Sequence, residues 1–256
     1  MSLLLAVVIA AVAATAPAPV APSPIEQRFL EGETLDYSLK WLKVTGGTAR
    51  MTISPAEGEA RYRITSVAKS SPGFSRFFKV RDEIETLVER SDFSTVRYVK
   101  RLDEDGDKIE ETTVIENGTA TRTRKKVKKV KVPRPVMDPI SVIDYLRTVD
   151  LSPGKKYDLN LIADGKLYNV QAIVIREEKV ETPLGVFDCV RVEPRMISGG
   201  VVRQERLFIW YTKDERRLPV RIRTEVKVGA ITATLVGVSS GVGSIDPPVL
   251  TDSRAR

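Results

Sequence analysis

The chain has 256 residues, with 41 Lys or Arg against 34 Asp or Glu and a formal net charge of +7. It contains no His and a single Cys, which excludes His-based catalytic triads, His metal sites and an intrachain disulfide. We therefore expect no metal and no cofactor. Cys189 lies in an apolar, strand-like segment, where a free Cys is typically a small core residue rather than a nucleophile.

The first residues have the pattern of an export signal. An unbroken apolar run, Leu3 to Ala14, is followed by small residues, although no Lys or Arg precedes it. The run is shorter than the ~20 apolar residues of a membrane-spanning helix. We expect residues 1–16 to be a cleaved signal peptide that directs the protein to the periplasm. Residues 17–29 should be an extended, unpacked Pro-rich spacer.

Alternating apolar and polar residues then predict a series of β-strands. Residues 35–41 and 49–53 form the first pair, and a three-residue loop between them would set Trp41 opposite Met51. Further strands are expected at residues 61–64, 80–88 and 95–102. Three aromatic residues between these strands have helical spacing and favour a short helical turn whose rings plug the core. They are Phe74, Phe77 and Phe78.

Asn117-Gly118 is a strong signal for a type I′ turn between residues 109–116 and 119–132. The predicted long hairpin sets Glu111 opposite Arg124, and it pairs several acids with bases in the same way.

Asp138-Pro139 then opens the one convincing helix, at residues 138–148. Asp can cap a helix and Pro suits its first position. The helix carries an apolar stripe of Ile140, Ile143 and Leu146, which needs a surface to bury against.

The second half of the chain continues the strand pattern. Asp164-Gly165 predicts a two-residue turn that sets Leu161 opposite Tyr168, and further strands are expected at residues 186–192 and 201–211. The last hairpin runs from Leu218 to Leu235. Its Gly229-Ala230 suits a type II′ turn, which would set Thr224 opposite Leu235.

Many short strands, tight turns and one helix predict an all-β, mainly antiparallel fold. We expect a single domain at residues 30–245, followed by a loose tail at residues 246–256. Its curved sheet should form an open barrel or half-barrel with the short helix across its mouth. A two-sheet β-sandwich is the alternative.

A basic run at residues 122–134 holds eight Lys or Arg and no acid, which is the pattern of an anion-binding surface. The competing interpretation is a solvated sheet edge, since Lys often protects exposed edge strands. The candidate anion-binding residues are Lys125, Lys126, Lys128, Lys129, Lys131 and Arg134. No aromatic residue interrupts the run, which argues against nucleic acid. The expected partners are anionic lipid or an acidic envelope polymer, with contact to a membrane surface.

Residues 207–211 are apolar on both faces of the predicted strand, so one face needs a cover or a ligand. The cover is expected to be the 138–148 helix. If the helix leaves a gap, an apolar ligand would fill it. The candidate cavity residues are Tyr37, Trp41, Phe208, Trp210 and Ile143.

These features favour a binding protein over an enzyme. Acid pairs lie in polar turns or strands without an apolar pocket to tune their pKa values, and no nucleophile or phosphate-loop pattern is present. We expect a non-enzymatic binding or carrier protein for an apolar or anionic envelope component such as lipid. The alternative is a structural or interaction protein of the envelope with a filled core.

Several short motifs resemble the exported bacterial proteins of the domain of unknown function 3108 family. The motifs are residues 32–37 with Trp41, residues 138–141 with 145–147, residues 182–187 with Cys189, residues 192–194, and the segment 210–235. The similarity spans roughly residues 30–240. It implies an exported, mostly antiparallel β protein, and it implies no activity and no functional residue.

Overall fold

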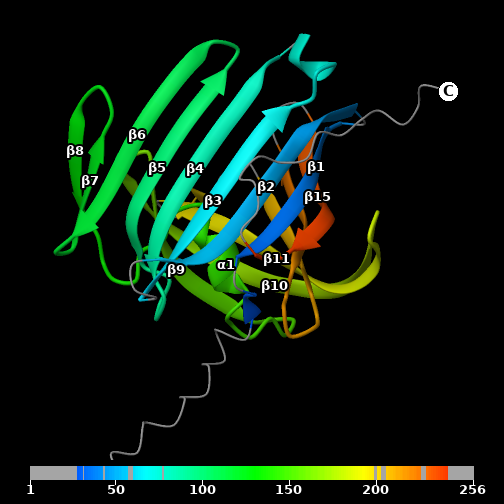
Figure 1. The fold of residues 1–256 in the computed structure, drawn as a ribbon. Helices are drawn as coiled ribbons and strands as arrows, with labels where there is room; N and C mark the ends of the chain where they lie inside the picture. The colour runs from blue at the N-terminus through cyan, green and yellow to red at the C-terminus, as the bar shows by residue number, and fades with distance from the viewer. Residues whose placement is uncertain are drawn as a thin grey trace, which may run out of the picture.

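Antiparallel pairing joins the strands of the chain into one strongly curved sheet (Figure 1). The computed structural model describes residues 28–30, 32–42, 44–56, 60–76, 78–198, 201–202, 206–225 and 229–241. The predicted signal peptide and most of the spacer and the tail lie outside these residues.

The first half of the chain forms a meander, β1 to β8, with a short 3-10 turn, η2, between β3 and β4. Its elements are β1 (Glu33–Trp41), β2 (Val44–Ala56), β3 (Arg61–Ser70), η2 (Phe74–Arg76), β4 (Val80–Glu89), β5 (Thr95–Glu104), β6 (Asp107–Glu116), β7 (Thr119–Thr123) and β8 (Val127–Lys131).

One helix separates this meander from the remaining strands. The elements are α1 (Ser141–Leu146), β9 (Lys156–Ala163), β10 (Lys166–Thr182), β11 (Gly185–Ser198), β12 (Val201–Val202), β13 (Leu207–Thr212), β14 (Pro219–Glu225) and β15 (Ala230–Ser239). Strand β15 pairs with β1, so the sheet runs in the order β8-β7-β6-β5-β4-β3-β2-β1-β15-β14-β13-β11-β10-β9, with β12 beside β11.

The two edges of the sheet approach each other without forming a ladder. Met137 makes a single parallel bridge to Leu161, and its backbone nitrogen donates to the Asn160 carbonyl over 2.9 Å. Lys100 also reaches across to Asp164 with an Nζ–Oδ1 distance of 2.6 Å. The prediction of a mainly antiparallel open barrel is therefore confirmed.

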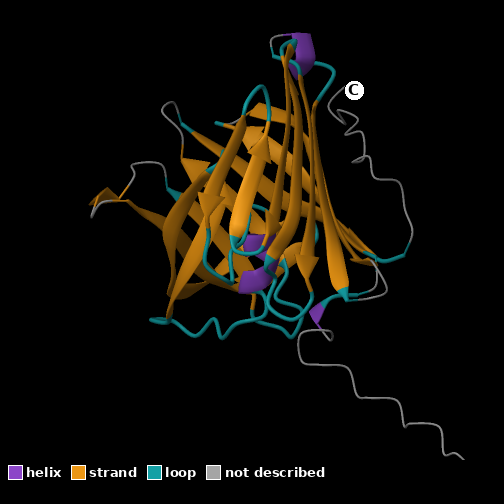
Figure 2. Cartoon of the chain, turned by 90° about the vertical axis from the view of Figure 1, so that its left-hand side faces the viewer, coloured by secondary structure: helices purple, strands orange, loops and turns teal. Residues whose placement is uncertain are grey.

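Helix α1 lies inside the curve of the sheet (Figure 2) and is largely buried. Asp138 organises the turn before it. Its Oδ1 accepts hydrogen bonds from the backbone nitrogens of Ile140 and Ser141, and its Oδ2 accepts from the hydroxyls of Thr86 and Thr95 at 2.6 and 2.7 Å. The helix is six residues long, shorter than predicted, and Asp138 caps the turn that leads into it.

The main core surrounds α1 and contains the inward-facing residues of both halves of the sheet. Ile143 and Leu146 of the helix pack with Tyr37, Ile209 and Tyr211, all of them buried. The Tyr211 hydroxyl donates to the Ile143 carbonyl over 2.9 Å. Burial of large apolar side chains on this scale is the dominant stabilising term. The helix thus covers one face of β13, as predicted.

Arg147, just after α1, ties the N-terminal segment to the core. The side chain is fully buried, and its Nη1 lies 2.6 Å from Glu33 Oε1 and 3.1 Å from Asp144 Oδ1. Its guanidinium lies over the Phe29 ring, 4.3 Å from the centroid. Phe29 is buried in a second cluster, so packing begins within the segment 17–29 that was predicted to be an unpacked spacer.

Two predicted turns have the expected register. Leu161 pairs with Tyr168 across Asp164-Gly165. At Asn117-Gly118 both residues have positive φ, 48° and 66°, as a type I′ turn requires.

The predicted register of the first pair is wrong, because Trp41 pairs with Val44 and Leu35 is the residue that faces Met51. Gly47 therefore lies within β2. A Cβ on Gly47 would lie 2.1 Å from the Lys69 carbonyl oxygen, so this glycine permits close strand contact rather than a loop.

The register of the last hairpin also differs from the prediction. Thr224 pairs with Ile231 rather than with Leu235. Residues 226–228 lie outside the described part of the chain. A Cβ on Gly229 would lie 2.2 Å from Leu42, so this glycine makes room for the neighbouring turn.

The long basic hairpin is interrupted. The register around Asn117-Gly118 holds as far as Thr112 opposite Thr123, and the chain then reverses at residues 124–126 into the edge strand β8. Glu111 therefore does not face Arg124 and instead bonds to Arg122, with Oε2 and Nη2 2.5 Å apart.

Candidate functional site

The structure separates the five residues that were predicted to line an apolar cavity. Ile143 of α1 and Tyr37 of β1 are buried in the main core, where the Tyr37 hydroxyl donates to the Pro219 carbonyl over 2.9 Å. Trp41 is partly exposed at the far tip of the sheet. Phe208 and Trp210 lie together on the outer face of β13, away from the Tyr37 and Ile143 pair in the core.

The predicted anion-binding residues lie along the β8 edge of the sheet and on the turn before and the segment after it. Lys131 donates to the Thr119 hydroxyl, and Arg134 pairs with Asp92 over 3.0 Å. Arg134 therefore has the acidic partner that the sequence did not reveal.

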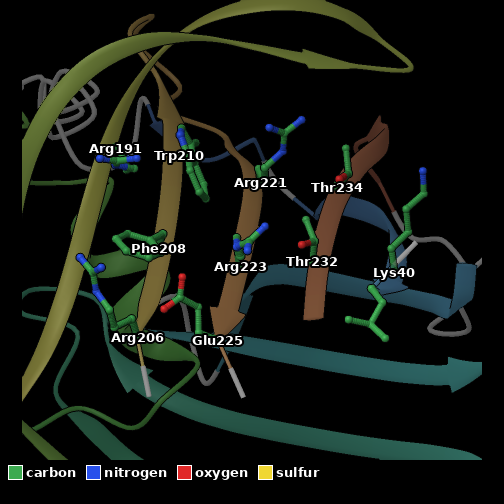
Figure 3. Close-up of a pocket in the computed structure, with 11 residues that line it drawn as sticks. Lys40, Arg191, Arg206, Phe208, Trp210, Arg221, Arg223, Glu225, Thr232 and Thr234 are labelled. Carbon is green, nitrogen blue, oxygen red and sulfur yellow. The ribbon is translucent and has the colours of Figure 1, made fainter. Parts of the chain in front are cut away.

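A different basic surface forms a groove of about 620 Å³ on the outer face of the sheet (Figure 3). We call it the outer groove. It is lined by Lys40, Leu42, Arg191, Arg206, Phe208, Trp210, Arg221, Arg223, Glu225, Thr232 and Thr234. Five of these side chains are cationic and one is acidic, so the groove is positively charged.

Strand pairing places the lining residues in two rows across the sheet. Trp210 lies between Arg191 of β11 and Arg221 of β14. Next to it, Phe208 pairs with Arg223.

Residues of β15 and β1 extend this second row. Arg223 pairs with Thr232, and Thr232 pairs with Lys40 on its other side. The outward positions of five strands, β11, β13, β14, β15 and β1, thus combine aromatic rings, hydroxyl groups and cations on one surface.

The arginines cover the faces of the two aromatic rings. The Arg206 guanidinium lies 4.6 Å from the Phe208 centroid, and that of Arg191 lies 5.3 Å from it. Arg221 lies 5.9 Å from the Trp210 centroid. Such contacts are stabilising, and they hold guanidinium groups beside an apolar floor. The arginines therefore cover the outer face of β13, whereas helix α1 covers its inner face.

Two of the five cations have no hydrogen bond or ion pair within the described chain, namely Lys40 and Arg223, and both are exposed. By contrast, Arg206 pairs with Glu193 over 2.9 Å and Arg191 lies 3.5 Å from Glu178. The groove therefore offers two uncommitted positive charges, Arg223 beside Phe208 and Lys40 further along the same row beyond Thr232. Cations next to an aromatic ring are the chemistry needed to bind an anion that has an apolar part.

Strands β10 and β11 arch past one side of the groove (Figure 3) and anchor its aromatic floor. The Trp210 indole donates to Glu178 Oε1 over 2.5 Å, and Arg221 donates to the Glu181 carbonyl over 2.7 Å. Burial alone would raise the pKa of Glu178. Hydrogen bonds from Trp210 and Arg176 outweigh burial and hold this pKa below its ordinary value, so Glu178 is ionised at neutral pH.

Cys189 is buried in the main core, as predicted for a small core residue. Burial raises the pKa of its thiol to about 12, which leaves almost no thiolate at neutral pH. Within the described residues, no three Cys, Asp or Glu side chains come together as a metal site. None of the described helices has both the length and the apolar character to cross a membrane.

The sequence alone pointed to some of the residues that line the outer groove. Phe208 and Trp210 were singled out because their strand is apolar on both faces. The alternation at residues 218–224 already places Arg221 and Arg223 on one face of β14. What the sequence could not show is that β13 and β14 pair so that these arginines stand beside the two rings.

The chain belongs to the family described as protein of unknown function (DUF3108), whose sequence profile matches residues 35–236. The resemblance based on the short motifs is thereby confirmed. A search of curated proteins found no match.

Among solved structures, a β-barrel-like protein of domain of unknown function DUF1849 from Brucella abortus aligns with a TM-score of 0.57 and 12% identity. The alignment covers 82% of this chain and 97% of that one, and at this identity it shows a similar fold alone.

Two other solved structures align more weakly. The hypothetical protein CT021 from Chlamydia trachomatis has a TM-score of 0.41 at 7% identity, over 90% of this chain and 98% of that one. A protein from Bacteroides fragilis described as exported, with a YmcC-like fold, has a TM-score of 0.31 at 10% identity, over 82% and 96% of the two chains. Both scores are too low to carry an argument.

Proposed function

We propose that the protein is a non-enzymatic binding protein of the cell envelope, and that its outer groove holds an anionic amphiphile such as a lipid. The observation that carries this proposal is the pairing of Phe208 with Arg223 on an open surface, with Lys40 beyond Thr232 in the same row. The anionic group would bind Arg223 and Lys40, and the apolar part would lie along Phe208 and Trp210.

The groove has the dimensions and composition for this role. Its volume of about 620 Å³ lies within the ~300–1,000 Å³ range of small-molecule sites. Its floor is apolar, and Arg191 and Arg206 are held in place by contacts with the Phe208 ring and with Glu178 and Glu193. Positions that are held before binding reduce the entropy cost of association. The apolar run at Leu3 to Ala14 supports a location in the envelope.

Binding can be tested with dodecyl phosphate as a soluble probe, below the concentration at which it forms micelles. The chain has two Trp residues, so Trp210 is the only one left in a Trp41→Phe variant and its emission reports on the groove. We expect dodecyl phosphate to change this emission, and inorganic phosphate or dodecyl maltoside to have a much weaker effect.

Arg223→Ser should weaken dodecyl phosphate binding about tenfold, because it removes one charge-assisted contact. The matched control is Arg97→Ser. Arg97 is also a half-exposed strand residue, but it pairs with Glu85 away from the groove. Equal binding by Arg223→Ser and the parent protein, or no binding by either, would contradict the proposal.

The second candidate function is a structural or interaction protein with a filled core. The observation that favours it is the burial of Tyr37, Tyr211 and Leu146 around α1, where side chains of the main core pack together. This candidate predicts that dodecyl phosphate leaves Trp210 emission unchanged.

A further inference from the structure

The 3-10 turn η2 stands at a tip of the sheet remote from α1 (Figure 2), and an apolar patch lies around it. We call it the rim patch. It comprises Trp41, Leu42, Val44, Phe74, Phe78 and Ile231. Ten large apolar side chains are exposed in the described chain, and five of them belong to this patch. Single exposed apolar residues are ordinary, but a cluster of this kind marks an interaction surface.

The patch is built from three turns that the sheet brings together. Trp41 pairs with both Val44 and Ile231 across β1, β2 and β15. The Phe74 ring of η2 meets the Trp41 ring edge-on, with centroids 6.4 Å apart. The Leu42 backbone nitrogen donates to the Ala230 carbonyl over 3.2 Å. The rims of three hairpins thus share one surface.

The aromatic residues after β3 do not plug the core, which corrects the prediction from their helical spacing. Segment η2 buries none of its residues, and Phe78 is 42% exposed. Phe77 lies outside the described residues. The 3-10 turn at Phe74–Arg76 stands at the outermost tip of the long strands, where no other element covers it (Figure 2).

Exposed cations flank the rim patch on two sides. Lys40 lies on β1, and Arg76 and Lys79 lie on the η2 segment. In the part of the chain that the structure describes, none of these three makes an ion pair. Glu104 and Asp105 follow on the neighbouring turn, beyond Lys79. On the β14 side, Arg223 pairs with Thr232 and Glu225 with Ala230, on either side of Ile231. With these two residues included, the border carries four cations and three acids among the described residues, around protruding aromatic and aliphatic side chains.

We propose that the rim patch docks on the surface of a lipid bilayer that contains anionic lipid. Trp and Phe side chains favour the interface between headgroups and acyl chains, and flanking Lys and Arg are attracted to anionic headgroups. A protruding tip suits a deformable bilayer, because a rigid protein partner would need a matching hollow. Charge complementarity is the observation that selects this occupant over a second copy of the chain.

Docking in this orientation brings the outer groove to the membrane. Lys40 and Leu42 both line the groove. Leu42 also belongs to the rim patch, and Lys40 borders it. One end of the groove therefore opens beside the docked surface. The docking itself depends on rim residues and does not require the groove to be occupied.

Docking can be tested by cosedimentation with vesicles of phosphatidylcholine alone and of phosphatidylcholine with phosphatidylglycerol. In a Trp210→Phe variant, Trp41 is the only Trp and reports on the rim patch. We expect its emission to shift to shorter wavelength with the anionic vesicles. Binding should fall when salt shortens the Debye length to about 3 Å.

The double variant Val44→Ser with Phe78→Ser should lower the partition coefficient at least about tenfold, since it removes two exposed apolar side chains from the surface that inserts. The matched control is Val127→Ser, an equally exposed position on the edge strand β8. Both variants should unfold at nearly the same temperature as the parent protein, because neither position is buried.

Three outcomes would overturn the proposal. They are equal vesicle binding by the double variant and the parent, no binding to anionic vesicles, and a dimer in solution that the double variant converts to a monomer. The last outcome would assign the rim patch to contact between two copies. Arg223→Ser separates this test from that of the groove, because it should weaken dodecyl phosphate binding and leave the Trp41 response to vesicles unchanged.

Discussion

Replacing Arg147 with Met should cost the protein about 4 kcal/mol of stability. The guanidinium is fully buried, pairs with Glu33 and Asp144, and donates to the backbone carbonyls of Arg28 and Arg216. Removing one partner of a buried ion pair typically costs about 3–5 kcal/mol, because the other charge is left uncompensated. Met fills a similar volume, so a cavity contributes little.

The structure indicates which carboxylate is left without a partner. Glu33 keeps the Arg216 guanidinium, 2.8 Å away, whereas Asp144 has no other cation within hydrogen-bonding distance among the described residues. The double variant Arg147→Met with Asp144→Asn should therefore recover at least about 1 kcal/mol relative to Arg147→Met alone.

The pH dependence of this effect follows from Asp144. Burial raises its pKa to about 6, and it does so despite the opposing effect of Arg147. Without Arg147 the pKa rises further. An acid whose folded pKa lies above its unfolded value loses its stabilising contribution as pH rises through the folded pKa. The cost of Arg147→Met should thus be smaller near pH 5 than near pH 8.

Urea unfolding, followed by tryptophan fluorescence and circular dichroism at both pH values, measures these costs. Arg63→Met is the matched control, because Arg63 makes a half-exposed ion pair with Glu85 that should contribute less than about 1 kcal/mol. A loss below about 1 kcal/mol for Arg147→Met, or a double variant less stable than the single one, would refute the argument.

Two further predictions concern a carboxylate and a glycine. Burial and the nearby Glu104 raise the pKa of Asp82 to about 6, and its Oδ1 is buried without a hydrogen-bond partner. Asp82→Asn should therefore raise the free energy of unfolding by about 1 kcal/mol near pH 8, a figure that allows for partial solvent screening, and by almost nothing near pH 4. Thermal unfolding at both pH values checks this. Gly47→Ala should cost at least about 2 kcal/mol in urea unfolding, because the new Cβ would overlap the Lys69 carbonyl. Gly73→Ala, with open space around it, should cost far less, and an equal loss in the two variants would rule out this explanation.

Local turn chemistry was predictable where the turn itself demands a special backbone. Asn117-Gly118 and Asp164-Gly165 both adopt positive φ at each residue, and the strands on either side pair in the expected register. Gly47 was misassigned to a loop, whereas Gly229 does lie directly before β15 with a φ of 83°, and only the register of its hairpin was wrong. Each is needed because a distant segment approaches closely, and such contacts leave no mark on neighbouring residues.

The candidate site was only partly predictable for a related reason. Alternation shows that Phe208 and Trp210 share a face, and that Arg221 and Arg223 share a face. It does not show which strands are neighbours. The basic run at residues 122–134 was conspicuous in the sequence, but the fold places it along an edge strand rather than in a groove.

The sequence by itself determined the class of fold, the positions of most strands and of the helix, and the role of Asp138 in the turn that leads into the helix. Each of these depends on interactions between residues close in the chain or on a repeating pattern of burial. Tertiary structure decided the pairing of β15 with β1, the register of the first and last hairpins, and the placement of the arginines over the rings of β13. These features arise from contacts between residues far apart in the chain. Such contacts form only when the whole sheet assembles, so neighbouring residues do not reveal them.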